Sequence, residues 1–320
     1  MINTLSRPKI VSIGAGNIGA TFAQYCAEMS LGDILLLDIV EGLPQGKALD
    51  LAQASSIRGY SVRIMGSNDF SDMKDADIVV VSAGFPRKPG MSRLDLLEKN
   101  GKIISEICEN IKSYAPNSIV IIITNPLDIM VQLAYHILGF PPKRVMGMAG
   151  ILDSARMSLF VASELEIDPT QVNAMVLGSH GDLMVPLPDY TCVNGIPITQ
   201  LLSKEKIEKI IERTRKGGAE IVSLLKTGSA YYAPSASAVR MVKAILQDEK
   251  SVLPCAVYAN GEYQITGYFV GLPCVLGRVG VEKIIELPLT QEKLKELHYS
   301  VEEVKQGIKQ LRELGFPIPQ

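Results

Sequence analysis

The sequence of 320 residues has little of what defines several common protein classes. Its five cysteines include no C-x-x-C pair, and this odd, scattered set argues against a disulfide framework or a cysteine-based zinc site. The longest apolar runs, such as 78–81 and 119–123, are too short to cross a bilayer. We therefore expect free thiols, no metal site and no membrane partner.

The chain also lacks a long run of charge of either sign. Its 32 basic and 34 acidic residues give a formal net charge of −2. This balance does not favour nucleic acid or a membrane surface as a partner, whereas a small anionic substrate needs only local basic groups. The first ten residues contain no apolar segment typical of a secretory signal, so we expect a cytoplasmic protein.

Two sequence patterns alternate in the first half of the chain. Short β-branched runs predict strands that are buried on both faces of a parallel sheet. These strands are expected at 10–13, 34–37, 78–81 and 119–123. Helical periodicity lies between them, at 18–29, 45–57 and 94–112. The alternation predicts an α/β fold with a doubly wound parallel sheet of the Rossmann type.

The pattern changes near residues 145–150 and becomes mixed. Helices are predicted at 154–165, 204–225 and 291–314, and strands after 172, at 253–258 and at 268–276. We therefore predict two domains, a dinucleotide-binding domain at 1–148 and a C-terminal α+β substrate domain at 149–320. No linker rich in Pro, Gly or Ser separates them, so we expect a shared interface.

A glycine motif, G-x-G-x-x-G, lies directly between the first predicted strand and the first predicted helix. In this context the glycines allow a tight turn, a close approach of the backbone to a pyrophosphate, and close packing of helix on strand. The helix N-terminus also attracts the anion. We expect the cofactor to bind the residues of this loop, which are Gly14, Ala15, Gly16, Asn17, Ile18 and Gly19.

Asp38 ends the second predicted strand, 19 residues after Gly19. A carboxylate at this place accepts hydrogen bonds from ribose hydroxyls and repels a 2′-phosphate. Ile39 and Val40 follow it and supply no cation to neutralise such a phosphate. The motif therefore favours NAD over NADP. The alternative is an ordinary glycine-rich turn followed by an acidic strand end.

A basic loop with Arg87, Lys88 and Arg93 follows the strand predicted at 78–81. Ligands of open α/β sheets bind at the carboxyl ends of the strands, which is where this loop lies. Arginine binds carboxylates through two parallel hydrogen bonds. The loop therefore predicts a carboxylate substrate, and a solvated basic loop is the alternative.

Only three histidines are present. His136 lies in a predicted helix, where we expect a packing or surface role, and His298 lies in the charged C-terminal helix, where we expect it to be solvated. His180 lies instead in a loop between Gly178 and Gly181, and these small neighbours leave room for a ligand.

Oxidation of an alcohol by NAD requires a base for the hydroxyl proton, and a histidine with a pKa near 6.5 is suited to that exchange. A base also requires an orienting partner. Asp153 and Arg156 are three residues apart in a predicted helix and so share a face. Asp153 is placed to orient the ring of His180, and Arg156 to bind a carboxylate.

Together these motifs resemble the lactate/malate dehydrogenase family over nearly the whole chain. The matching segments are GAGNIG at 14–19, AGFPRKPGMSR at 83–93, TNPLD at 124–128, LDSAR at 152–156 and GSHGD at 178–182. Within the family, the chain looks most like the bacterial malate-specific branch that is similar to lactate dehydrogenases. The resemblance implies an NAD-dependent enzyme that interconverts (S)-malate and oxaloacetate.

The resemblance also implies roles for individual residues. His180 corresponds to the general acid/base and Asp153 to its orienting carboxylate. Arg156 corresponds to the residue that binds the C1 carboxylate of the substrate. Arg93 corresponds to the loop arginine that polarises the reacting carbonyl once the loop closes.

The same resemblance implies contacts around the nicotinamide. Asn125 corresponds to the residue that contacts both the substrate and the nicotinamide ribose, and Asn100 to a further NAD contact. Residues Ile123, Thr124 and Asn125 are expected to line the nicotinamide.

Substrate choice depends in the family on the position of Arg87, where lactate enzymes carry glutamine. Arg87 is expected to pair with the second carboxylate of oxaloacetate, and Ala230 replaces a bulkier threonine of the lactate enzymes. A lactate dehydrogenase with an unusual loop is the alternative within the family, and a non-catalytic NAD-binding protein is the alternative outside it. The family also implies a homo-oligomer, for which we expect a tetramer, with a dimer as the alternative.

Overall fold

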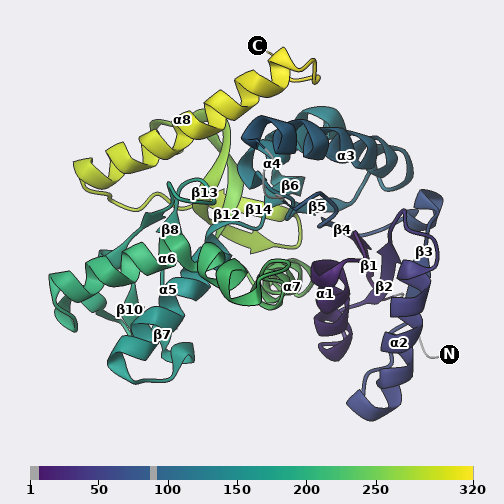
Figure 1. Ribbon diagram of the computed structural model, residues 1–320, viewed down its shortest axis with the longest axis horizontal. Helices are drawn as coiled ribbons and strands as arrows, with labels where there is room; N and C mark the ends of the chain where they lie inside the picture. The colour runs from purple at the N-terminus through teal and green to yellow at the C-terminus, as the bar shows by residue number, and fades with distance from the viewer. Residues whose placement is uncertain (1–6, 87–91, 320) are drawn as a thin grey trace.

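The computed structural model describes residues 7–86 and 92–319. A nine-stranded sheet runs through this part of the chain in the order β14-β13-β12-β6-β5-β4-β1-β2-β3, with helices on both faces (Figure 1). The chain thus has the α/β fold predicted from its alternating pattern. Among the described residues, no helix is both long and apolar enough to span a membrane.

Six parallel strands form one half of the sheet. They are β1 (Lys9–Ile13), β2 (Asp33–Leu37), β3 (Ile64–Ser67), β4 (Ile78–Val81), β5 (Ile119–Ile122) and β6 (Val145–Gly147). The four strands expected from apolar runs are confirmed, while β3 and β6 were not expected. Because β1 lies between β2 and β4, the chain reverses its winding there, and such a switch point is where open α/β sheets bind ligands.

The continuous apolar runs are explained by burial on both faces of the sheet. Ile10 and Ile78 belong to a core cluster with α1 (Asn17–Glu28) and α7 (Tyr232–Leu246). Their neighbours Val11 and Val79 belong to the opposite cluster, which α3 (Arg93–Tyr114) and α4 (Leu127–Leu138) cover. Successive residues of a strand point to opposite faces, so neither face tolerates polar alternation.

Local signals explain where the helices of this half begin and end. Ser92 caps α3 in a reciprocal capping box with Asp95. Helix α2 (Leu43–Arg58) ends at Gly59, whose φ of 78° lies in the left-handed region that favours glycine. Helices α1, α2 and α3 therefore match the three helices predicted at 18–29, 45–57 and 94–112.

The second half of the chain extends the same sheet with three antiparallel strands. These are β12 (Ser251–Asn260), β13 (Thr266–Gly277) and β14 (Gly280–Ile284). Ala256 of β12 pairs with Gly147 of β6, and Ser235 of α7 donates a hydrogen bond of 2.9 Å to the carbonyl of Ile18 on α1. The two predicted domains are thus in contact, while their division at residue 148 stays a prediction.

The remaining α-helices and two small sheets lie around this extension (Figure 1). The helices are α5 (Gly150–Leu165), α6 (Lys204–Leu225) and α8 (Gln291–Glu313). Two small sheets contain β7 (Val172–Asn173), β10 (Cys192–Val193) and β11 (Ile196–Pro197), and β8 (Val176–Leu177) and β9 (Val185–Pro186). Short 3-10 helices are η1 (Phe70–Met73), η2 (Pro142–Arg144), η3 (Pro169–Gln171), η4 (Pro188–Tyr190), η5 (Ile198–Gln200) and η6 (Glu262–Gln264). The predicted helices at 154–165, 204–225 and 291–314 are present, whereas α7 and β14 were not expected.

Candidate active site

The glycine loop has a backbone that suits each of its three glycines. Gly14 follows β1 with a φ of 101°, and a β-carbon there would lie 2.7 Å from the amide nitrogen of Ala83. A β-carbon at Gly19 would collide with the carbonyl of Gly14. A β-carbon at Gly16 would meet no described atom within 4 Å, so the surface above it is open. The loop thus offers the open backbone approach that a pyrophosphate requires.

The N-terminus of α1 lies at the same loop. The helix begins at Asn17, and Gly16 in front of it makes no side-chain cap, so its first N–H groups lack a side-chain acceptor. Asp38, at the end of β2, accepts hydrogen bonds from the amide of Ala15 at 2.7 Å and from the amide of Val40 at 3.0 Å. The residues present therefore fit the phosphate and ribose of a dinucleotide.

Asn100 connects the loops at the other end of this edge. Its side chain is buried, donates to the carbonyls of Asn125 at 2.7 Å and Phe85 at 3.2 Å, and accepts from the amide of Phe85 at 2.8 Å. Thr124 donates to the carbonyl of Ala83 at 2.7 Å. Ile123 and Thr124 are buried, whereas Asn125 is exposed. Asn100 thus holds two loops together, and its expected contact with NAD stays a prediction.

His180 and Asp153 meet although they are 27 residues apart in the chain. The Nδ1 atom of His180 lies 2.8 Å from Oδ2 of Asp153, and Asp153 is almost completely buried in the first turns of α5. Because the carboxylate accepts the Nδ1 proton, Nε2 is the ring atom that can exchange a proton with a substrate. Oδ1 of Asp153 accepts a hydrogen bond of 3.0 Å from Nη1 of Arg156, so the three residues expected to work together are in contact.

The surroundings of His180 act on its pKa in opposite directions. Burial lowers the pKa, whereas the charge and hydrogen bond of Asp153 raise it, and the result is a pKa above the ordinary 6.5. Arg156 lowers the pKa, and the nearby Asp128 raises it. A histidine held in this way can deliver a proton to a carbonyl oxygen near neutral pH.

Asp128 is a part of this site that sequence reasoning did not identify. It lies in the first turn of α4, and its Oδ2 accepts a hydrogen bond of 2.8 Å from the backbone amide of His180. Its Oδ1 is buried and has no hydrogen-bond partner among the described residues. Burial raises the pKa of Asp128 to about 6. Asp128 closes the TNPLD segment at 124–128, but an acid at the start of an apolar helix is ordinarily explained by the helix dipole, so no role was assigned to it.

The predicted basic loop is described only in part. Arg87 and Lys88 lie outside the described residues. Arg93 is the first residue of α3, is largely exposed, and forms an ion pair with Glu303 on α8. The structure therefore does not bring Arg93 into the cluster around His180.

Three other residues were singled out in the sequence, and the structure shows where each of them lies. Ala230 lies in the coil before α7, and it is half-buried. His136 packs within α4, where its Nε2 lies 3.0 Å from Nε2 of Gln132, as expected for a packing residue. The expectation of a solvated His298 was wrong, because α8 packs onto the corner after β12 and the ring donates a hydrogen bond of 2.8 Å to the carbonyl of Tyr263.

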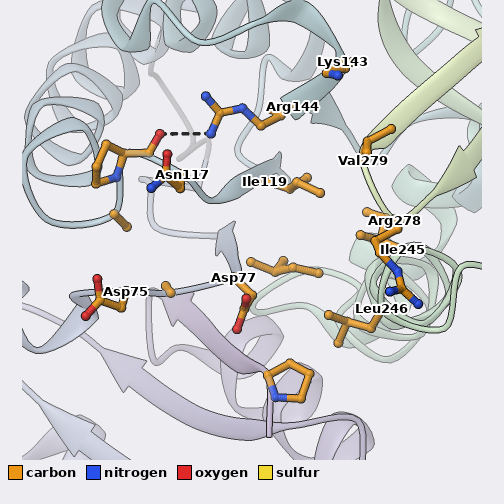
Figure 2. A pocket seen from close by; sticks show the side chains of 15 residues that line it. Asp75, Asp77, Asn117, Ile119, Lys143, Arg144, Ile245, Leu246, Arg278 and Val279 are labelled. Carbon is orange, nitrogen blue, oxygen red and sulfur yellow. Dashed lines mark hydrogen bonds between the residues drawn. The ribbon is translucent and has the colours of Figure 1, made fainter. Parts of the chain in front are cut away.

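A pocket of about 810 Å³ lies at the opposite edge of the sheet, beside the amino ends of β1, β4 and β5 (Figure 2). Its lining carries both signs of charge. Asp75 and Asp77 lie on one side of the pocket, and Lys143 and Arg144 lie on the other side. Arg144 is engaged by the carbonyl of Pro116 at 2.9 Å. None of the expected site residues lines this pocket, so the candidate active site is the cluster at the carboxyl edge.

Known protein families and relatives are similar to this chain in sequence. The lactate/malate dehydrogenase NAD binding domain matches residues 8–147, and the lactate/malate dehydrogenase alpha/beta C-terminal domain matches residues 151–314. A malate dehydrogenase of Rhodopirellula baltica is 54% identical over 94% of this chain and 96% of its own. One of Methanosarcina mazei is 52% identical over 95% and 99% of the two chains.

Solved structures agree on the fold. Malate dehydrogenase of Cryptosporidium parvum has a TM-score of 0.94 at 43% identity and covers 96% of this chain and 99% of its own. Lactate dehydrogenase of the same organism, complexed with lactic acid and NAD, has a TM-score of 0.92 at 40% identity over 96% and 98% of the chains. The chain belongs to the lactate/malate dehydrogenase family, and its cofactor is NAD.

Proposed function

We propose that the protein is an NAD-dependent malate dehydrogenase that interconverts (S)-malate and oxaloacetate. The observation that carries this proposal is the contact of His180 with Asp153 and of Asp153 with Arg156, at the edge of the sheet that holds the glycine loop. The relatives that are 50–54% identical are named malate dehydrogenases, so a lactate dehydrogenase is not favoured.

His180 moves the proton in the proposed reaction. In malate oxidation the neutral ring accepts the hydroxyl proton at Nε2, and in oxaloacetate reduction the charged ring returns that proton to the carbonyl oxygen. Bound NAD supplies the acceptor for the hydride that leaves the carbon. Asp153 holds the ring through Nδ1 and stabilises its charged form, which is formed or consumed in each turnover.

Arginines bind the substrate in this proposal. Arg156 uses one nitrogen for Asp153 and presents its remaining donors to the C1 carboxylate. Arg93 polarises the reacting carbonyl after its loop moves toward the site, and Asn125 contacts both substrate and nicotinamide ribose. Arg87 pairs with the second carboxylate, and the small Ala230 leaves space for it.

Cofactor binding is proposed for the residues of the carboxyl edge. Gly14 to Gly19 hold the pyrophosphate, and Asp38 holds the adenosine ribose. The nicotinamide end is formed by Asn100, Ile123, Thr124 and Asn125. Support comes from the open backbone above Gly16 and from the hydrogen bond between Asp38 and the loop.

Selectivity against pyruvate follows from the charge of Arg87. With pyruvate bound, the second carboxylate that would pair with Arg87 is absent, and leaving one member of a buried charge pair alone costs about 2–5 kcal/mol. That penalty corresponds to a discrimination of roughly 30- to 4,000-fold. A difference of one methylene group in an apolar pocket would give only about 10- to 200-fold.

A homo-oligomer in the cytoplasm, a tetramer rather than a dimer, completes the proposal. Large apolar side chains are exposed on the surface of α2, where Ile57 is 87% exposed, and on α6, where Leu224 is 73% exposed. Burial of such side chains against another copy of the chain would stabilise an assembly. Sedimentation analysis of the purified protein tests the assembly state.

The test of the activity is the initial rate of NADH consumption with oxaloacetate and with pyruvate, each repeated with NADPH. We expect oxaloacetate with NADH to react fastest. The variant His180→Ala should still bind NADH but should lose about 10²- to 10⁴-fold in turnover, as is usual for loss of a general acid/base. Faster turnover of pyruvate would contradict the malate assignment. NADH binding without any turnover would indicate a non-catalytic NAD-binding protein.

A further inference from the structure

Helix α6 contains two adjacent glycines, Gly217 and Gly218, in its interior. Neither has a positive φ, so the helical backbone itself does not require glycine at these positions. Glycine is a poor residue inside a helix because it loses the most backbone entropy on folding and adds no packing. The pair therefore needs an explanation outside α6.

Arg156 of α5 provides that explanation. A β-carbon at Gly217 would lie 3.0 Å from Cδ of Arg156, 3.5 Å from Nε and 3.7 Å from Cγ. A β-carbon at Gly218 would lie 3.4 Å from Nη2 and 3.9 Å from Cζ and Nη1. The aliphatic part of Arg156 thus crosses the backbone at Gly217, and its guanidinium group lies over Gly218.

The Arg156 guanidinium is also held by Asp153. Nη1 is bound to Asp153 at 3.0 Å, and the side chain of Arg156 is only 14% exposed. The guanidinium is therefore confined between the carboxylate that orients His180 and the side-chain-free surface of α6. A side chain at Gly217 would have to displace the stem of Arg156 by a few tenths of an ångström.

We propose that Gly217 is a positioning residue for Arg156: its missing side chain sets the place of the arginine stem and guanidinium group, and with it the binding of the substrate carboxylate. The inference rests on the proposed role of Arg156 in binding that carboxylate. A purely structural role in packing α5 against α6 would instead affect stability and leave substrate affinity unchanged.

The variant Gly217→Ala tests the proposal. Alanine favours the helix, but its methyl group lies closer to Arg156 than ordinary contacts allow. A misplacement of 1 Å in an active site can cost about 100-fold, so a shift of a few tenths should raise the KM for oxaloacetate by about three- to tenfold. The kcat should stay within about threefold, because a carboxylate is bound alike in the ground state and the transition state. A β-carbon at Gly218 would make only ordinary van der Waals contact with the guanidinium, so Gly218→Ala should keep the KM within about twofold of the parent.

The matched control is Gly46→Ala, which is also a glycine within a helix. It lies in α2, and a β-carbon there would meet no described atom within 4 Å. This variant should keep the KM of the parent. Thermal unfolding of each variant shows whether it is folded, and we expect the melting temperature of Gly217→Ala to be no lower than that of the parent.

Arg156→Ala and the double variant with Gly217→Ala separate the inference from the proposed function. If Gly217 acts through Arg156, Gly217→Ala has no further effect on KM once Arg156 is removed. An unchanged KM in Gly217→Ala, or an equal rise in KM with and without Arg156, overturns the inference. An unchanged KM in Arg156→Ala instead contradicts the proposed role of Arg156 itself.

Discussion

Replacement of Asp153 by asparagine removes one charge from the centre of the proposed site while keeping the shape of the side chain. The carboxylate is buried, and it accepts hydrogen bonds from Nδ1 of His180 at 2.8 Å and from Arg156 at 3.0 Å. Removing one partner of a buried, hydrogen-bonded charge pair costs about 3–5 kcal/mol. If this cost falls on the transition state, kcat/KM for oxaloacetate drops roughly 150- to 5,000-fold.

The same substitution reverses the direction in which the pKa of His180 departs from its ordinary value. In the parent, burial lowers the pKa, and Asp153 outweighs burial to raise it above 6.5. Without Asp153, burial and Arg156 both still lower the pKa, and Asp128 alone raises it. We therefore expect a pKa of His180 below its ordinary value in Asp153→Asn.

Rates in both directions against pH test this reasoning. Oxaloacetate reduction requires charged His180, so its rate falls as pH rises through the pKa, and this fall should occur at lower pH in Asp153→Asn. Malate oxidation requires neutral His180, so its plateau should be reached at lower pH. The exposed Asp189→Asn is the matched control and should match the parent. Unmoved pH limbs, together with a loss of less than about tenfold, would refute the orienting role of Asp153.

Three further predictions concern single residues. Since burial raises the pKa of Asp128 from 3.8 to about 6, the folded state binds this proton more tightly than the unfolded state, and stability falls by about 2 kcal/mol as pH rises from 4 to 7. Asp128→Asn removes this dependence, so the free energy of unfolding by urea should rise for the variant, relative to the parent, as pH rises from 4 to 7. An equal difference between variant and parent at pH 4 and at pH 7 would contradict the raised pKa of Asp128. Asp38→Gly should reduce the preference for NAD over NADP, measured as the ratio of kcat/KM values, because the carboxylate that repels a 2′-phosphate is lost; an unchanged ratio would show that another group sets the choice. Arg87→Gln should lower kcat/KM for oxaloacetate by roughly 30- to 4,000-fold, while that for pyruvate is kept or raised, and equal losses with both substrates would exclude a role in discrimination.

Much of the fold was predictable because its signals are local. The apolar runs that became β1 and β4 are continuous, since those strands are buried on both faces, and periodicity alone identified α6. Helix α7 was missed because it opens with small residues and a proline, Ala233, Pro234 and Ser235, which are also typical of a turn. Strand β3 is a short edge strand with a glycine in its interior, which weakens its pattern.

The site was predictable only in its parts. The context of the glycine loop, a strand before and a helix after, identified Gly14, Gly16 and Gly19, and the structure shows an open backbone where the pyrophosphate is expected. His180 was distinguished by its small neighbours. Asp128 was not identified from the sequence. Its contact with the amide of His180 joins residues 52 positions apart, and an acid in the first turn of a helix is common by itself.

The sequence by itself determined the alternation of strands and helices in the first half of the chain, the phosphate loop and the choice of NAD, because each depends on residues close together along the chain. The tertiary structure decided which groups meet and what charge they carry. Burial and contact with Asp153 and Asp128 set the pKa of His180, and the bare backbone of α6 confines Arg156. Electrostatic energies depend on distance and on exclusion of water, and both are created only when distant segments pack together.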